Sequence, residues 1–349
     1  SLNEWRNSNK YFFNNQNEIR VRKIVNEKLK KDIATTVTKF NSALDELNKT
    51  LEIVNSSVGP EQRAEIKQAI DDASQTSANV RKFSEKFKDR FFDVGIAEEH
   101  AAVMAAGMAI GKGKSVLMMY STFAQRAFDQ LLNDITRQNL GVFVMLDRAG
   151  VVGKDGPTHQ GIYDIAMLGL MPNIKIMMGR NASETKGLVT YGLNHKGPIA
   201  LRYPKLTTID LEEVLIENES WEIVKEGNKG YIISYGPDVE RILNIINENN
   251  LDLTLINARF IRPLDEELLL QIAKDDKPIL IYEQVVESSS LAMMITFFFV
   301  NNKFNTTNIN HMSFDTNQIV THGDIKEVLE YYHLGDKDIL ERINDIWKD

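Results

Sequence analysis

The chain has 349 residues with 26% charged and 43% hydrophobic side chains, and its formal net charge is −8 at pH 7. This length allows two or three domains with a large buried core, and the acidic balance argues against nucleic acid and anionic membranes as partners. The sequence contains no cysteine, which excludes disulfides, thiolate nucleophiles and cysteine-type zinc sites.

The segment at residues 1–80 differs from the rest in being rich in Asn, Lys and Glu. Its apolar residues follow a helical a/d spacing, and Gly59-Pro60 is typical of a helix end followed by a new first turn. We therefore expect an antiparallel helical hairpin. A second interpretation stays open, in which residues 51–56 form a strand. The spaced residues are Phe40, Leu44, Leu47, Leu51, Val54 and Val58.

From Arg90 onward, short apolar runs alternate with helically spaced stretches, which predicts α/β structure with a parallel sheet. We expect this first α/β domain at residues 81–210. Its expected strands are Phe91–Ile96, Ser115–Met119, Val142–Leu146 and Lys175–Met178, and its expected helices are Ala97–Ala109, Phe123–Gln138 and Ser183–Leu193.

The same alternation returns after a boundary that we place near residues 205–220, giving a second α/β domain at residues 211–349. Its expected strands are Lys229–Ser234, Leu253–Asn257 and Pro278–Tyr282, and its expected helices are Asp238–Glu248 and Asp265–Ala273. No apolar run reaches the roughly 18 residues of a membrane span, and Ser1–Tyr11 does not resemble a signal peptide. We therefore expect a soluble, cytoplasmic protein that does not bind membranes.

Polar and aromatic residues lie at the predicted strand ends, where ligands collect along a parallel sheet. Glu98 stands between a strand and a helix, although a carboxylate at a helix start is equally often a dipole partner. Phe123 follows the next strand, although an aromatic there more often belongs to the core. The loop Asp155–Gly161 carries an acid and an imidazole, although such loops are usually only turns. Arg202 is equally consistent with a solvated loop end.

Several blocks of the sequence, in the order in which they occur, indicate a protein family more specifically than any single residue does. The chain resembles the pyrimidine-binding and C-terminal domains of the 1-deoxy-D-xylulose-5-phosphate synthase family, thiamine diphosphate enzymes related to transketolase, over residues 80–345. The resemblance implies two three-layer, parallel-sheet domains: the thiamine-diphosphate pyrimidine-binding fold and the transketolase C-terminal fold. The matching blocks are FFDVGIAEEHA, YSTFAQRAFDQ, LDRAGVVGKDGPTHQG, LRYP, NARFIRPLDEELL and THGDIKEVLEYYHLGDKDI.

The resemblance implies a cofactor site around Glu98. In the family, the matching acid hydrogen-bonds the aminopyrimidine of thiamine diphosphate and favours the imino tautomer that starts catalysis. A carboxyl suits this task because it shares a proton, whereas Gln does not and Asp does not reach as far. Phe123 matches the aromatic that stacks on the pyrimidine, and Tyr120 stands beside it in the cofactor and substrate site.

The resemblance also implies substrate contacts. Arg126 and Arg202 match the two arginines that clamp the phosphate of the acceptor, glyceraldehyde 3-phosphate, since a guanidinium binds phosphate through two hydrogen bonds. Asp155 and His159 match catalytic polar residues that face the donor, pyruvate, and His159 is expected to assist proton transfer. The implied product is 1-deoxy-D-xylulose 5-phosphate, a precursor for isoprenoids and thiamine.

Departures from the family pattern limit this expectation. The chain contains no Gly-Asp-Gly, the motif with which the family holds magnesium and the diphosphate, so no metal site is expected here. Magnesium is expected only through a diphosphate-binding domain that this sequence lacks. Lys205 and Leu206 stand where the family has Arg-Gly, and Glu287–Ser290 replaces a glycine-rich stretch. Lys205 keeps the positive charge.

Three functions follow as hypotheses. The first is an active pyrimidine-domain half of such a synthase, working as a homodimer or with a separate diphosphate-domain chain. The second is an inactive truncated relative that acts in binding or assembly. The third is the β subunit of a 2-oxoacid dehydrogenase, which keeps the acid but is expected to lack the acceptor-phosphate arginines.

Overall fold

The computed structural model describes residues 82–205 and 212–348, in two units. In the part of the first unit that is described, residues 82–86 are helical, and the rings of Phe83 and Phe87 lie 4.8 Å apart. The second unit, residues 94–348, holds all the named elements. The expected helical segment at residues 1–80, including the choice of helix or strand at 51–56, lies outside the described residues.

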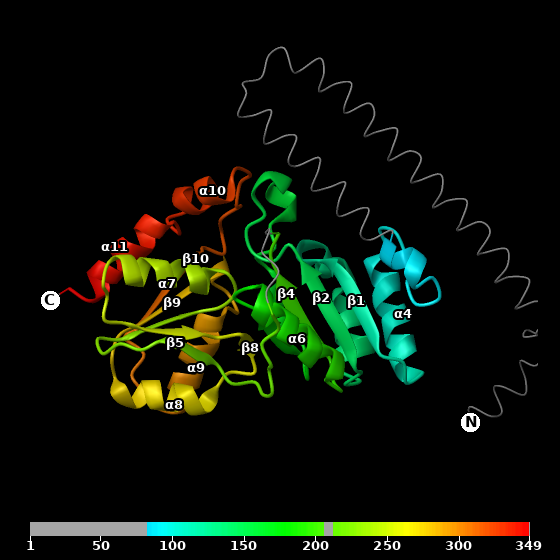
Figure 1. Ribbon diagram of the computed structural model, residues 1–349, viewed down its shortest axis with the longest axis horizontal. Helices are drawn as coiled ribbons and strands as arrows, with labels where there is room; N and C mark the ends of the chain where they lie inside the picture. The colour runs from blue at the N-terminus through cyan, green and yellow to red at the C-terminus, as the bar shows by residue number, and fades with distance from the viewer. Residues whose placement is uncertain (1–81, 206–211, 349) are drawn as a thin grey trace, which may run out of the picture. The chain divides into compact units, whose positions relative to one another are not determined.

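The first sheet has the strand order β1-β2-β4-β3-β8 (Figure 1). The first four strands run parallel, and β8, from later in the chain, pairs antiparallel with β3. Tyr120, Asp147 and Tyr203 end three neighbouring strands at one level. The strands are β1 (Ser115–Tyr120), β2 (Val142–Asp147), β3 (Lys175–Met178), β4 (Ile199–Tyr203) and β8 (Phe260–Arg262).

Helices cover both faces of this sheet. On one face, Val144 and Ala200 share a core with the helices Glu98–Ile110 and Gln130–Thr136. On the other face, Phe143 and Leu201 pack with Leu188. Alternate residues along each strand therefore pack into two separate cores, one on each face of the sheet. The helices are α4 (Glu98–Ile110), the 3₁₀ segment η1 (Ser121–Ala127), the π-type segment η2 (Gln130–Thr136), α5 (Asp164–Gly169) and α6 (Ala182–Asn194); two short 3₁₀ turns are η3 (Gly153–Asp155) and η4 (Pro157–His159).

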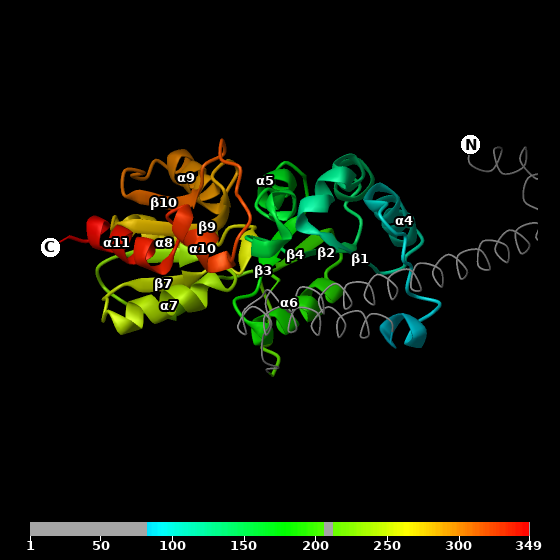
Figure 2. The ribbon, with the colours of Figure 1, turned by 90° about the horizontal axis from the view of Figure 1, so that it is seen from above.

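The second sheet has the order β10-β9-β6-β7-β5, parallel except for β5. Helices α7, α10 and α11 contribute to the core on one face, while α8 and α9 cover the other (Figure 1). Figure 2 shows α7 and α9 on opposite sides of these strands. The strands are β5 (Glu222–Lys225), β6 (Tyr231–Ser234), β7 (Thr254–Asn257), β9 (Ile279–Val286) and β10 (Ile309–Phe314). The helices are α7 (Asp238–Glu248), α8 (Glu266–Asp275), α9 (Leu291–Asn301), α10 (Ile325–Tyr331) and α11 (Asp336–Ile346).

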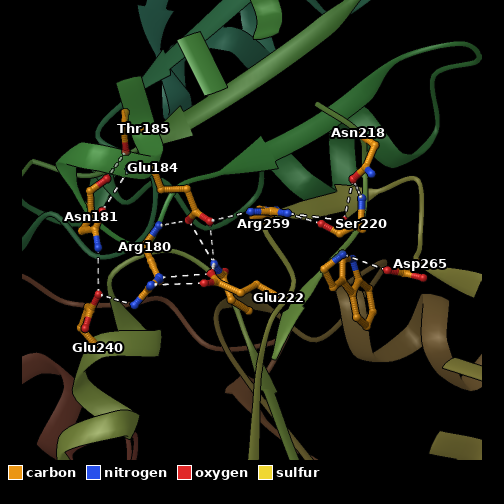
Figure 3. A network of polar contacts seen from close by, with 12 residues as sticks. Arg180, Asn181, Glu184, Thr185, Asn218, Ser220, Glu222, Glu240, Arg259 and Asp265 are labelled. Atoms are coloured by element: carbon orange, nitrogen blue, oxygen red, sulfur yellow. Dashed lines mark hydrogen bonds and ion pairs between the residues drawn. The ribbon is translucent and has the colours of Figure 1, made fainter. Parts of the chain in front are cut away.

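A polar network centred on Glu184 of α6 joins the two sheets (Figure 3). The Asn257 side-chain amide donates to both carboxylate oxygens of Glu184, at 2.9 and 3.0 Å. The Arg180 backbone N–H donates to the same carboxylate at 2.7 Å, and the Arg180 guanidinium pairs with Glu240 of α7 at 2.9 Å. Glu184 is buried, so these donors replace the water that a carboxylate requires. The network ties α6 and β3 to the second sheet.

The predicted fold class is confirmed: the chain forms two α/β sheets, each with helices on both faces. Each sheet also carries one antiparallel strand that the purely parallel expectation did not include. Among the helices of residues 82–205 and 212–348, none combines the length and apolar composition needed to cross a bilayer.

Two local predictions need correction. Phe91–Ile96 is not a strand, because no strand among the described residues pairs with it, and Phe92 and Ile96 are exposed. The helix expected at Phe123–Gln138 divides into 3₁₀ and π segments, with Arg137 N–H bonding the Leu132 carbonyl five residues back. The expected elements did not include β4, α5, β5, β8, α9, β10, α10 and α11.

Candidate active site

The candidate site lies at the carboxyl ends of β1 and β2, the edge at which parallel sheets bind ligands. Tyr120 ends β1 and leads directly into η1, which carries Phe123 and Arg126. Asp147 ends β2 and is followed by Arg148 and the turns that carry Asp155 and His159. The strand register therefore brings together residues that lie up to 39 positions apart in the sequence, counted from Tyr120 to His159.

Glu98 is the first residue of α4, where the helix dipole favours a carboxylate. Its side chain is 12% exposed, and its Oε1 accepts a hydrogen bond from Arg126 Nη1 at 3.1 Å. Helix α4 packs against η1 and β1, which directs the start of the helix toward the site. Glu98 is thus largely buried, and the exposed part of its side chain can contact a ligand.

An aromatic stack lies next to Glu98. The Tyr120 and Phe123 rings are nearly parallel, with centroids 5.5 Å apart. The guanidinium carbon of Arg126 lies 4.4 Å from the Phe123 centroid. Arg126 therefore places one flat N–H-bearing group over Phe123 while it donates to Glu98. This arrangement is favourable because the ring face attracts a cation.

His159 meets the same stack from the loop after β2. Its ring contacts the edge of Phe123, with centroids 5.2 Å apart, and its Nδ1 lies 2.9 Å from the Thr158 hydroxyl oxygen. The Thr122 hydroxyl donates to the Thr158 carbonyl at 3.1 Å, which ties this turn to η1. The loop is therefore held against the aromatic residues.

Two cations hold Asp155. Arg148 Nε donates to Asp155 Oδ2 at 3.1 Å, and Lys205 Nζ donates to Oδ1 at 2.6 Å. Burial alone raises the pKa of Asp155, but the hydrogen bonds and charges of Lys205 and Arg148 outweigh it and hold the pKa below its usual value. Asp155 is consequently an anion at neutral pH.

Arg148 connects these groups, although no role was predicted for it from the sequence. Its guanidinium carbon lies 4.0 Å from the Tyr120 centroid, and it also pairs with Asp147. Burial raises the pKa of Asp147, against the opposing effect of Arg148. The signal was present in the sequence, since Arg148 lies two residues after the end of the predicted strand Val142–Leu146.

Arg202 has different partners from those expected. Its side chain is 1% exposed, and it donates to both carboxylate oxygens of Asp164, at 2.8 and 3.0 Å. Arg202 Nη2, one of the two nitrogens that donate to Asp164, also donates to the Gly161 carbonyl at 3.4 Å. The structure thus brings together Glu98, Tyr120, Phe123, Arg126, Asp155 and His159, whereas the Arg202 guanidinium is engaged inside the protein. Its expected phosphate contact stays a prediction.

No three acidic or histidine side chains within the described residues form a group that suits a metal ion. The groups that the site does offer are several carboxylates, two stacked aromatic rings, an imidazole and several cations. Such a set suits a flat, nitrogen-containing ring beside an anionic substrate.

Comparison with known proteins agrees with this architecture. Residues 61–209 match the model for the pyrimidine-binding domain of transketolase, and residues 219–339 match the model for the transketolase C-terminal domain. The chain therefore belongs to the transketolase family, with these two domains.

Curated relatives narrow the comparison within that family. The chain is 38% identical over 282 residues to 1-deoxy-D-xylulose-5-phosphate synthase of Lysinibacillus sphaericus, covering 78% of this chain and 44% of the relative. It is 37% identical over 284 residues to the protein of the same name from Carboxydothermus hydrogenoformans, covering 80% and 45%. The chain thus spans less than half the length of these relatives.

Solved structures share the fold. A structure described as a split-gene transketolase, inactive β4 tetramer, matches with a TM-score of 0.66 at 22% identity, covering 76% of this chain and 86% of that chain. Transketolase from Campylobacter jejuni matches with a TM-score of 0.59 at 16% identity, covering 73% and 39%.

Proposed function

We propose that this chain is the pyrimidine-domain part of a thiamine-diphosphate-dependent synthase. The reaction would decarboxylate pyruvate and join the remaining two-carbon unit to glyceraldehyde 3-phosphate, giving 1-deoxy-D-xylulose 5-phosphate. The observation that carries the proposal is the Glu98 carboxylate bonded to a planar group that lies over the Phe123 ring, in a chain whose curated relatives are named for this synthase.

The residues present fit the pyrimidine end of the cofactor. An aminopyrimidine would have to hydrogen-bond Glu98 and lie over the Phe123 ring. The planar guanidinium of Arg126 makes both of these contacts, so it occupies the place that the cofactor ring would take. A ligand ring that entered this place would displace the 42%-exposed Arg126 side chain toward solvent. When bound, thiamine diphosphate supplies the carbanion chemistry that protein side chains lack.

Each residue then has a definite task. Glu98 would hold a proton at the pyrimidine nitrogen, Phe123 would support the ring, and Tyr120 would close the side of the site. His159, in contact with Phe123, is placed to move a proton near the substrate, and Asp155 would face the donor. General acid–base catalysis by such a group contributes about 10²–10⁴-fold in rate.

The acceptor phosphate needs cations. Arg126 becomes available once its contact with Glu98 breaks, and Arg148 and Lys205 flank Asp155 nearby. Arg202 would first have to leave Asp164. We therefore propose Arg126, supported by Arg148 and Lys205, as the main phosphate contacts.

The diphosphate and magnesium are proposed to bind a diphosphate-binding domain outside these residues, because the sequence contains no Gly-Asp-Gly. The test is a titration of thiamine diphosphate with magnesium into the purified chain, alone and with a separately produced diphosphate domain, followed by product analysis with pyruvate and glyceraldehyde 3-phosphate. We expect binding and product only with the partner present.

Matched variants sharpen this test. Glu98→Gln should lower turnover by about 10²–10⁴-fold, since an amide does not exchange the proton. Glu99→Gln removes the same charge from the neighbouring, exposed position of α4 and should leave turnover unchanged. Absence of binding both with and without the partner contradicts the proposal and favours the binding or assembly function. Transfer of an acetyl unit to a lipoyl domain would instead identify a 2-oxoacid dehydrogenase subunit.

A further inference from the structure

The loop Val151–Gln160 follows β2 of the first sheet, yet its ends are anchored on β9 of the second sheet. Val151 N–H donates to the Gln284 side chain at 3.2 Å. The Ile162 carbonyl, just beyond the loop, accepts from Val286 N–H at 3.1 Å. The side chains of Val151 and Ile162 are buried in a core of the second sheet. This loop carries the acid and the imidazole of the candidate site, and we call it the site loop.

Gln160 adds a contact between the site loop and a more distant part of the chain. Its side chain is buried, and its Oε1 accepts from Val152 N–H across the loop at 2.9 Å. Its Nε2 donates to the Thr321 carbonyl at 2.8 Å, and Thr321 lies between β10 and α10. One buried amide therefore joins a backbone donor of the site loop to a backbone acceptor that follows the last strand of the second sheet.

The segment that contains Thr321 is itself held in place. The Tyr332 hydroxyl donates to the Ile319 carbonyl at 2.9 Å and accepts from Thr321 N–H at 3.1 Å. The Tyr332 ring meets the edge of Phe314 in β10, with centroids 5.5 Å apart. The position of the Thr321 carbonyl is therefore fixed by the second sheet and its helices.

Close packing brings the same two segments together at two further positions. A methyl group on Gly153 would lie 2.9 Å from the Gly323 carbonyl oxygen, and a methyl group on Gly156 would lie 3.9 Å from His322 Cβ. Gly153 and Gly156 also have φ values of 59° and 94°, which residues with a side chain rarely adopt. The site loop thus follows the segment at residues 321–323 closely.

We propose that Gln160 is a positioning residue that sets the place of the His159 imidazole. His159 precedes it in the chain, and the imidazole meets the Phe123 ring with centroids 5.2 Å apart. A catalytic side chain keeps its place only when the groups around it are locked by packing and hydrogen bonds. The inference rests on the proposed function, in which His159 moves a proton near the substrate. Without the amide, Val152 N–H and the Thr321 carbonyl lose their partner, and the site loop shifts.

The test compares variants of the full chain with the diphosphate-binding domain supplied. Gln160→Leu keeps a similar volume and removes both hydrogen bonds. We expect kcat to fall about 10–100-fold, because a displacement of about 1 Å at the reacting groups is sufficient for such a loss. The affinity for thiamine diphosphate should stay at the wild-type value, since Glu98 and Phe123 lie on α4 and η1.

Thr254→Val is the matched control. The Thr254 hydroxyl is also buried, and it bridges one N–H and one carbonyl, both of Gly227, at 3.0 and 2.8 Å. Thr254 is the first residue of β7, at the opposite end of the strand from the carboxyl edge. Thr254→Val therefore loses the same kinds of hydrogen bond as Gln160→Leu and should leave kcat unchanged. Circular dichroism verifies that each variant folds.

Gln160→Glu provides a readout that a merely structural role does not predict. An ionised glutamate accepts from Val152 N–H but does not donate to the Thr321 carbonyl, whereas the protonated acid does both. The ratio of its kcat to that of the wild type should therefore rise as the pH falls, while the ratio for Gln160→Leu stays constant. Tyr332→Phe should lower kcat from outside the site, and its effect should be less than additive with Gln160→Leu because both act through Thr321.

NMR measures the place of the imidazole without activity. The ring resonance of His159, identified by its loss in His159→Asn, should move in Gln160→Leu because the ring current of Phe123 depends on their distance. The resonance should stay unmoved in Thr254→Val. A wild-type protein that gives no product contradicts the proposed function, and the spectrum still decides the role of Gln160. An unmoved His159 resonance, or an unchanged kcat in an active enzyme, overturns the proposal.

Discussion

Replacing Arg202 by methionine tests whether its guanidinium stabilises the fold or serves a ligand. The side chain is almost fully buried, and it donates two hydrogen bonds to Asp164, whose carboxylate is 0% exposed. Without Arg202, that carboxylate keeps a backbone contact with Ile165 N–H at 2.9 Å and loses its counter-charge. The variant therefore leaves a charge buried without a partner.

The expected loss is large. Each hydrogen bond to a charged group contributes about 1.5–3 kcal/mol, so two of them agree with the roughly 3–5 kcal/mol that breaking a buried ion pair costs. A protein of this size loses about 2–4 °C in Tm for each kcal/mol, which predicts a drop of roughly 10 °C. The double variant Arg202→Met/Asp164→Asn removes both charges and should recover about half of the loss.

Urea and thermal unfolding, followed by circular dichroism, provide the measurement. Arg126→Met is the matched control, because this arginine was expected to have the same phosphate role but is 42% exposed and should cost less than about 1 kcal/mol. If Arg202→Met is as stable as the control, the guanidinium is not committed to Asp164. Arg202 would then be free to bind phosphate, and the reasoning from burial would be refuted.

Two further predictions concern the loop beside the site. The pKa of Asp155 is lowered in the folded chain, so its contribution to stability is present above the pKa of the unfolded state and is lost as the pH falls through the lower, folded value. Unfolding between pH 2 and 6 should therefore depend less on pH in Asp155→Asn than in the wild type, and identical slopes would contradict the ion pairs. A methyl group at Gly161 would lie 2.1 Å from the Arg148 carbonyl oxygen, so Gly161→Ala should cost about 1–3 kcal/mol. Gly169→Ala, with no atom within 4 Å of the added carbon, is the control and should be neutral or slightly stabilising.

Much of the fold was predictable because helices and strands leave a local record in the sequence. The apolar spacing after Ala97 matches α4, and the apolar run at Lys175–Met178 matches β3. These elements bury one face or both, so their period is visible in a short window. β4, Ile199–Tyr203, escaped notice because the charged Arg202 interrupts its apolar run, and that residue is buried only through its pairing with Asp164.

The candidate site was partly predictable for a related reason. Residues that follow neighbouring parallel strands meet at one edge, and this rule brings Phe123 to His159 and Asp155 to Lys205. By the same rule, Arg202 near the end of β4 was also expected in the site. The rule does not say whether a side chain at that edge points to solvent or into the core.

The sequence alone indicated the family and the alternation of strands and helices, and it predicted the acid and the aromatic residue of the candidate site. The tertiary structure decided which charges pair. Arg202 lies buried against Asp164, Asp155 lies between Arg148 and Lys205, and Phe91–Ile96 has no strand partner among the described residues. The physical reason is that periodicity is a property of neighbours along the chain. Ion pairing and strand pairing instead depend on which distant groups share the same low-dielectric interior or sheet edge.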